Sequence, residues 1–184
     1  MDIEFLESTG FPYIETLKEF GWWNFLTIHR SIYENLVRAF YSNANNTYHK
    51  HQLDKKFKTN IGDTNFKITT LVIHNKFGIH LDGEDYASWT QDYVKASQEV
   101  TRDDTLTTRI SNTNLMDLNT RLLHLICCQM IYPRNGSFSF VTRIDLWLLQ
   151  CIKAKRRLHL CLLMIESFTG KNRFCPMVWL LMNY

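Results

Sequence analysis

The sequence predicts a mainly α-helical, bundle-like domain with one small β-hairpin near residues 66–81. Three observations lead to this fold class. Apolar residues recur at helical spacing in several segments, alternation of apolar and polar residues is confined to one stretch, and turn-forming residues separate the segments. With 184 residues, 45% of them hydrophobic and 21% charged, the chain is long enough for one core and short for two. A single domain over residues 1–184 is therefore expected.

The first part of the chain contains two expected helices. Pro12 is suited to the first turn of a short opening helix. Ser31 and Glu34 have the spacing of a capping box, which predicts a helix with one apolar face from about Ile32 to Asn43. Residues 44–65 are polar and charged, and they are predicted to form a loop.

The only strong β pattern follows this loop. Apolar and polar residues alternate from Phe66 to Ile73, where β-branched residues dominate, and a shorter alternation runs from Phe77 to Leu81. The two runs are predicted to pair as a hairpin that packs on the helices. Asp82 with Asp85 is expected to cap a short helix, and residues 91–113 are predicted to be a surface linker.

The C-terminal half has the strongest helical periodicity. Apolar residues recur every three to four positions from Leu115 to Met130, and this helix is expected to end at Pro133. Thr142 and Asp145 again have the spacing of a capping box, which predicts a second helix that pairs with the first as a helical hairpin. Further helices are expected in two segments, Leu158–Phe168 and the residues after Pro176.

The N-terminal residues, the apolar runs and the cysteines lead us to expect a protein inside the cell, in the nucleus or the cytoplasm. The first ten residues are acidic and lack the cationic and apolar regions of a secretory signal. The longest apolar runs are shorter than the roughly 20 residues that cross a bilayer, so no membrane association is expected. Five cysteines, with Cys127 and Cys128 adjacent, are typical of reduced, buried thiols rather than a disulfide framework.

No catalytic or metal-binding spacing is evident in the sequence. A two-metal nuclease needs several strands to hold its carboxylates, and only one hairpin is predicted. The acidic residues weighed for this role are Asp82, Glu84, Asp85, Asp103, Asp104, Asp117 and Asp145. Neither a phosphate-binding loop nor a nucleophile elbow is present. We therefore expect no enzyme activity, no catalytic residue and no cofactor.

Zinc is also not expected from residue spacing. Zinc sites commonly use paired Cys-x2-Cys or His-x3–5-His ligands, whereas Cys127 and Cys128 are adjacent in a helix and point about 100° apart. His124 and the remaining cysteines look isolated. The apolar stripes of the C-terminal half are accordingly expected to contain no buried cluster of acid, thiol and imidazole groups.

A basic segment is the strongest candidate for contact with a partner. Cations outnumber acids in residues 106–184, and phosphate binding is driven by such charge. The candidate nucleic-acid-binding residues are Lys153, Lys155, Arg156, Arg157, Arg143 and Arg134. Cations at the end of a helix also offset its macrodipole, so a solvated helix end is the alternative interpretation.

Four segments carry distinctive packing and turn motifs. They are the W-x-x-F pattern at Trp22–Phe25, Asn35–Asn43, the extended stretch Ile68–Trp89, and the block Leu123–Ile165, in which a helix ends in Pro and a second apolar helix runs into a basic segment. Together these segments resemble the plant transposon protein domain family. The resemblance covers the chain from Phe20 onward and consists of packing and turn motifs. It implies an origin in plant transposable elements of the retrotransposon class, in a family with no agreed catalytic residues and no established biochemical role.

Three functional hypotheses remain open at this point. The first is a non-enzymatic structural or assembly module whose partner is nucleic acid or a second copy of the chain. The second is a nonspecific nucleic-acid-binding module centred on residues 153–157. The third is a degenerate or truncated fragment without activity, suggested by the unfinished apolar pattern that ends at Tyr184.

Overall fold

A computed structural model describes most of the chain. The described residues are 3–27, 33–43, 56–90, 92–133 and 137–169. Within them helices predominate, and the sheet consists of one antiparallel hairpin, so the predicted fold class is confirmed. None of the helices in this part of the chain combines the length and the apolar character that crossing a membrane requires.

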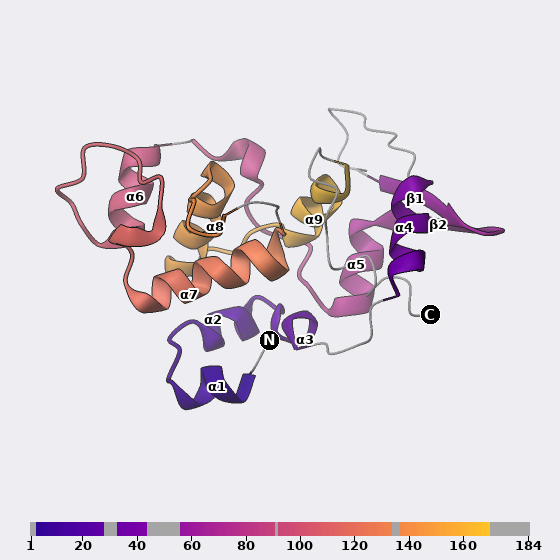
Figure 1. The fold of residues 1–184 in the computed structure, drawn as a ribbon, viewed down its shortest axis with the longest axis horizontal. Coiled ribbons are helices and arrows are strands. Elements are labelled where there is room, and N and C mark those ends of the chain that lie inside the picture. Colours follow the sequence, from indigo (N-terminus) through magenta and orange to yellow (C-terminus); the bar gives the residue numbers. More distant parts are fainter. Residues whose placement is uncertain (1–2, 28–32, 44–55, 91, 134–136, 170–184) are drawn as a thin grey trace.

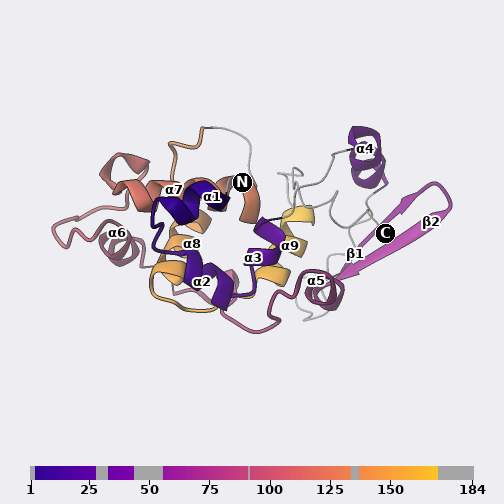
Figure 2. The same cartoon turned by 90° about the horizontal axis from the view of Figure 1, so that it is seen from below.

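The molecule is elongated, and its two halves are built differently (Figure 1). The half on the left of Figure 1 contains α1 (Ile3–Ser8), α2 (Ile14–Glu19), α6 (Tyr93–Thr101), α7 (Leu118–Ile126) and α8 (Arg143–Lys153). The half on the right contains α4 (Glu34–Ser42), β1 (Lys56–Ile61), β2 (Thr64–Thr69) and α5 (Thr70–Phe77). Between the halves lie α3 (Trp23–Leu26) and α9 (Leu160–Thr169), an arrangement that Figure 2 shows from below.

One hydrophobic core extends through both halves. In the helical half it surrounds Trp22 and Trp147, which are both fully buried. In the other half Phe40 of α4 stacks on Phe57 of β1, with ring centroids 5.1 Å apart. A two-stranded hairpin is marginal in water by itself, so this stacked pair gives the hairpin the apolar support that it needs.

The hairpin lies earlier in the chain than predicted. β1 begins at Lys56, inside the segment 44–65 that the sequence predicts to be a loop, and it pairs with β2 from Lys56 opposite Thr69 to Ile61 opposite Thr64. The loop prediction is therefore wrong for residues 56–61 and 64–65, and residues 44–55 lie outside the described part of the chain.

The predicted strand at residues 70–73 is instead the start of α5, and the predicted return strand, Phe77–Leu81, begins at the last residue of this helix and forms no strand. The Thr69 hydroxyl caps this helix by accepting a hydrogen bond from the Val72 amide at 3.3 Å. Gly78, with φ of 70°, ends it in the left-handed conformation that glycine adopts without strain. Ile73 and Phe77 are buried four residues apart, so burial on one helical face outweighs the β propensity of the segment.

The predicted linker at residues 91–113 contains a helix, α6. The Asp92 carboxylate caps it by accepting a hydrogen bond from the Lys95 amide at 2.9 Å. Ala96 and Val100 are buried on the side where α6 packs on α8. Because this apolar face is narrow and its neighbours are polar, the sequence of α6 shows little helical periodicity, and the helix was not predicted.

The remaining predicted helices are present with shifted ends. The opening helix is α2, which begins two residues after Pro12. The helix predicted from Ile32 is α4; it begins after Tyr33, which makes no side-chain cap, while Ser31 lies outside the described residues. On its predicted apolar face Phe40 is buried, Val37 and Tyr41 are half-buried, and Tyr33 and Leu36 are exposed. α9 confirms the helix predicted after residue 158, and the segment after residue 176 lies outside the described residues.

Candidate functional site

The helical hairpin of α7 and α8 brings together the groups of chemical interest. α8 begins with the predicted capping box: the Thr142 hydroxyl accepts from the Asp145 amide at 3.2 Å, and the Asp145 carboxylate accepts from the Thr142 amide at 2.7 Å. This reciprocal cap is confirmed. It also fixes the Asp145 carboxylate at the first turn of α8, where the side chain is fully buried.

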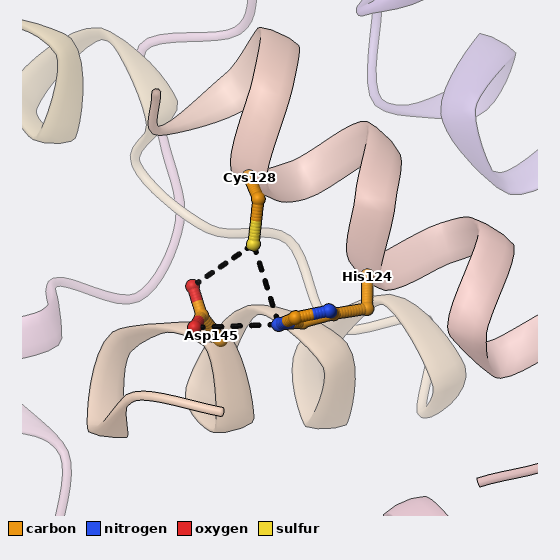
Figure 3. Close-up of side chains that lie close together, drawn as sticks. All are labelled: His124, Cys128 and Asp145. Atoms are coloured by element: carbon orange, nitrogen blue, oxygen red, sulfur yellow. Dashed lines mark hydrogen bonds and ion pairs between the residues drawn. The ribbon is translucent and has the colours of Figure 1, made fainter. Parts of the chain in front are cut away.

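Two side chains of the preceding helix meet this carboxylate (Figure 3). His124 Nε2 lies 3.3 Å from Asp145 Oδ2. Cys128 Sγ lies 3.3 Å from His124 Nε2 and 3.6 Å from Asp145 Oδ1. The exposed fractions of His124, Cys128 and Asp145 are 1%, 1% and 0%. We refer to these three residues as the buried cluster.

Local structure explains why His124 and Cys128 face the same way. Residues four apart lie one above the other on a helical face. After Ile126 the chain continues as a π-helical segment, Cys127–Ile131, in which the Tyr132 amide donates to the Cys127 carbonyl at 2.8 Å. Single π-helical turns inside helices occur frequently at functional sites.

The buried cluster does not have the geometry of a catalytic triad, because its side chains point toward one common position. In a nucleophile–histidine–acid triad, the acid contacts the ring nitrogen opposite the one that faces the nucleophile. Here the Cys128 sulfur and the Asp145 carboxylate both face Nε2 of His124. One nitrogen, one sulfur and one oxygen therefore meet, with all three ligand atoms within 4.8 Å of one another. Such a set is suited to holding a metal ion.

The expectation that the C-terminal apolar stripes contain no such cluster is wrong. The adjacent cysteines draw attention in the sequence, but the residues that converge are His124 and Cys128, at His-x3-Cys spacing. That spacing is the signal that could have identified half of the site. Asp145 is recognisable in the sequence only as a helix cap, because its contact with α7 depends on how the two helices pack.

Other thiols of the interior are kept protonated by burial. Burial raises the pKa of Cys127 well above its ordinary value, and the nearby Cys128 and Asp145 act in the same direction. Burial also raises the pKa of Cys151 and of Cys161 to about 12. Since the thiolate is the reactive form of cysteine, these three thiols are poor nucleophiles at neutral pH.

The predicted basic segment makes contacts inside the fold. Lys153 Nζ donates to the Val100 carbonyl at 2.6 Å and to the Thr120 hydroxyl at 3.1 Å, and desolvation lowers the pKa of its ammonium group. Arg156 Nη1 donates to both carboxylate oxygens of Glu84, at 2.9 and 2.8 Å.

The other predicted cations also have separate partners. Arg157 contacts Asp82 at 3.2 Å, so Asp82 is an ion-pair partner, while Asp85 alone caps the short 3-10 helix Tyr86–Ser88. Lys155 lies 3.9 Å from Glu19, and Arg143 lies over the ring of Tyr93. Arg134 is outside the described residues. Each described cation of the predicted set therefore has its own contact within the fold.

The carboxylates considered for a nuclease do not converge either. Asp117 caps α7 by accepting from the Thr120 amide at 2.7 Å, and Asp103 accepts from the amide and hydroxyl of Thr105. In the part of the chain that the structure describes, the buried cluster is the one group of three or more His, Cys, Asp and Glu side chains that could hold a metal ion.

Comparisons with protein-family models, with curated proteins and with solved structures find no match to this chain. The resemblance to the plant transposon protein domain family stays a prediction, and function has to be argued from residues and geometry.

Proposed function

We propose that this chain is a non-enzymatic helical module that acts in assembly, in line with the plant transposable-element origin that the resemblance implies. One observation carries the proposal. The cations of residues 153–157 make contacts within the fold, whereas four large apolar side chains on two adjoining segments are exposed.

The basic segment has a structural role that accounts for its charges. Glu84 donates its amide to the Arg157 carbonyl and accepts from the His159 amide, both at 2.9 Å. Gly83 passes so close to Leu158 that a Cβ there would lie 2.6 Å from its carbonyl carbon. The ion pairs Arg156–Glu84 and Arg157–Asp82 flank this close contact. The two ion pairs connect residues 82–84 with the residues that precede α9.

Four of the large exposed apolar side chains lie on two adjoining segments. The Thr113 amide donates to the Ser139 carbonyl, and the Val141 amide donates to the Ser111 carbonyl, both at 3.0 Å. Exposed fractions of 57% for Leu115, 80% for Leu118 and 58% for Phe140 are found here. We refer to Leu115, Leu118, Phe138 and Phe140 as the apolar edge.

A second copy of the chain is the partner that we propose for the apolar edge. Gathered apolar side chains on a surface mark interaction sites more often than single ones do. Symmetric pairing of identical chains is the commonest form of association and needs no other component.

Light scattering coupled to size-exclusion chromatography tests this proposal. We expect a dimer whose fraction rises with protein concentration, and we expect Leu118→Ser with Phe140→Ser to give a monomer with an unchanged circular dichroism spectrum. Leu71→Ser with Val72→Ser, at exposed positions of α5 in the other half, is the matched control and should leave the dimer intact. A monomer at every concentration, or a dimer that survives the first pair of substitutions, contradicts the proposal.

The non-enzymatic part of the proposal rests on the burial of the cluster, whose members are at most 1% exposed and offer no surface to a substrate. A magnesium-dependent DNA-cleaving activity that disappears in Asp82→Asn or Asp117→Asn would count against it.

The alternative, nonspecific nucleic-acid binding, has one observation in its favour, and it lies on the hairpin. Lys58 and Lys67 are exposed and directly opposite each other on β1 and β2. Like charges in this position repel, and a bound phosphate would relieve the repulsion. Residues 153–157 are less suited to this role because their cations already have partners.

A further inference from the structure

We propose that His124, Cys128 and Asp145 bind one divalent transition-metal ion of the zinc class. The inference goes beyond the assembly role and does not depend on it. Imidazole nitrogen, thiolate sulfur and carboxylate oxygen are the ligand atoms that zinc takes in proteins. A thiolate among the ligands favours zinc over magnesium or calcium, which prefer oxygen ligands.

The spacing of the ligand atoms fits a single ion. Zinc bonds of roughly 2.3 Å to sulfur and about 2.0–2.2 Å to nitrogen and oxygen place tetrahedral ligand atoms about 3.3–3.6 Å apart. In the buried cluster Nε2 lies 3.3 Å from Sγ and 3.3 Å from Oδ2, while Sγ lies 3.6 Å from the other carboxylate oxygen, Oδ1. One ligand atom from each residue lies within 4.8 Å of the other two, so a rotation of the Asp145 carboxyl group would let one oxygen bind the same ion as Nε2 and Sγ.

Hydrogen bonding alone does not account for the whole triangle. If His124 Nε2 donates its proton to Asp145, it cannot accept one from Cys128. If Nε2 instead accepts from the thiol, it has no proton for the carboxylate. Protons can thus occupy at most two of the three contacts, whereas an ion bound between the three side chains would contact all three residues.

Charge balance points in the same direction. A thiolate and a carboxylate buried side by side carry two negative charges, which is costly in an apolar interior. A divalent cation neutralises both, and His124 stays neutral as a nitrogen ligand. Binding releases the Cys128 thiol proton to solvent, so the affinity should rise with pH.

The surroundings of the cluster favour a structural ion over a catalytic one. The Thr142 amide, 2.7 Å from Asp145 Oδ2, orients the carboxylate as outer hydrogen bonds do at metal sites. Three protein ligands leave a fourth position, which a water molecule enclosed with the ion would fill, and the burial of the cluster keeps a substrate from replacing that water. The ion would join the π-helical segment to the first turn of α8.

Metal binding by the full chain tests the proposal. Chain refolded with zinc is expected to retain one ion per molecule, and Co²⁺ should produce the charge-transfer absorption of a cobalt–thiolate bond. X-ray absorption of the zinc-loaded chain should report one sulfur ligand. Zinc at about 100 times its Kd should raise the unfolding midpoint by roughly 5–10 °C, and magnesium should leave it unchanged.

Matched substitutions assign the site. Cys128→Ser should abolish the cobalt–thiolate absorption, whereas Cys151→Ala, at an equally buried thiol of α8, should retain it. Asp145→Asn keeps an oxygen for the Thr142 amide and should still lower the zinc affinity at least tenfold. If Cys128→Ser fails to fold, Asp145→Asn and the sulfur count of the unsubstituted chain decide. Absence of binding, more than one sulfur ligand, or undiminished affinity in Asp145→Asn overturns the proposal.

Discussion

The two ends of α8 use ionisable side chains in opposite ways. At the first turn Asp145 is fully buried and meets an imidazole and a thiol. Beyond the last turn Arg156 and Arg157 remain partly exposed and pair with acids on a neighbouring segment. Removing one partner from a buried set leaves the others desolvated, whereas an exposed ion pair contributes about 1 kcal/mol or less.

This difference indicates that the buried cluster, rather than the run of cations, is the candidate for binding chemistry. A run of cations is conspicuous in a sequence, but each of these cations is satisfied by a nearby acid or carbonyl. His124, Cys128 and Asp145 form no recognised metal-binding pattern in the sequence, and the fold brings them together. Perturbing each end of α8 separately tests the contrast.

Removal of the buried carboxylate should have the largest effect. Asp145→Ala deletes the cap of α8 and leaves His124 and Cys128 without their acid, so the free energy of unfolding should fall by about 3–5 kcal/mol. Urea denaturation followed by circular dichroism measures this. Asp117→Ala removes an exposed cap from α7 and should lower the free energy of unfolding by only about 1 kcal/mol. Equal losses for the two variants would contradict the contrast.

The second-largest effect should be a loss of folding stability at alkaline pH, caused by ionisation of the buried thiols. The folded pKa of Cys151 and of Cys161 is raised to about 12 and that of Cys127 is also raised, whereas thiols of the unfolded chain ionise near pH 9.0. The unfolded state therefore loses protons first, and the stabilisation present below that pH is lost as pH rises toward 12. We expect a loss of about 1 kcal/mol per thiol at pH 10, measured by urea denaturation.

Lys153 acts in the opposite direction, because its lowered folded pKa adds stability as pH rises toward 10.5, but three thiols outweigh one half-exposed ammonium group. Cys151→Ala removes one of the three thiols and should reduce the decline by about a third. Stability that stays constant from pH 8 to pH 10 would be inconsistent with protonated interior thiols.

Substitutions at the exposed end of α8 should have the smallest effect. Arg156→Gln with Arg157→Gln should lower the free energy of unfolding by less than about 1 kcal/mol per pair, and the difference should shrink at high salt. If the chain binds DNA, these substitutions should leave the salt dependence of the affinity unchanged, whereas Lys58→Ala with Lys67→Ala should reduce its log–log slope by about 2. A slope that changes with the arginine substitutions and not with the lysine substitutions would instead indicate that DNA binds at residues 153–157.

Segments with a wide apolar face or complete cap chemistry were predictable from the sequence. The capping box of Thr142 and Asp145 and the helix that it begins are examples. α5 was not predictable in this way, because alternating β-branched residues suit a strand as well as a helix, and the burial of Ile73 and Phe77 decides between them. α6 was missed because its apolar face is narrow and matters only where α8 covers it.

The sequence by itself determined the mainly helical fold class and the start of α8, because caps and apolar periodicity act over a few residues. It also placed His124 and Cys128 on one helical face through their spacing. Only the tertiary structure decided that Asp145 meets them and that the basic segment pairs with residues 82–84. Contacts between distant residues depend on how helices pack, and a local pattern cannot carry that information.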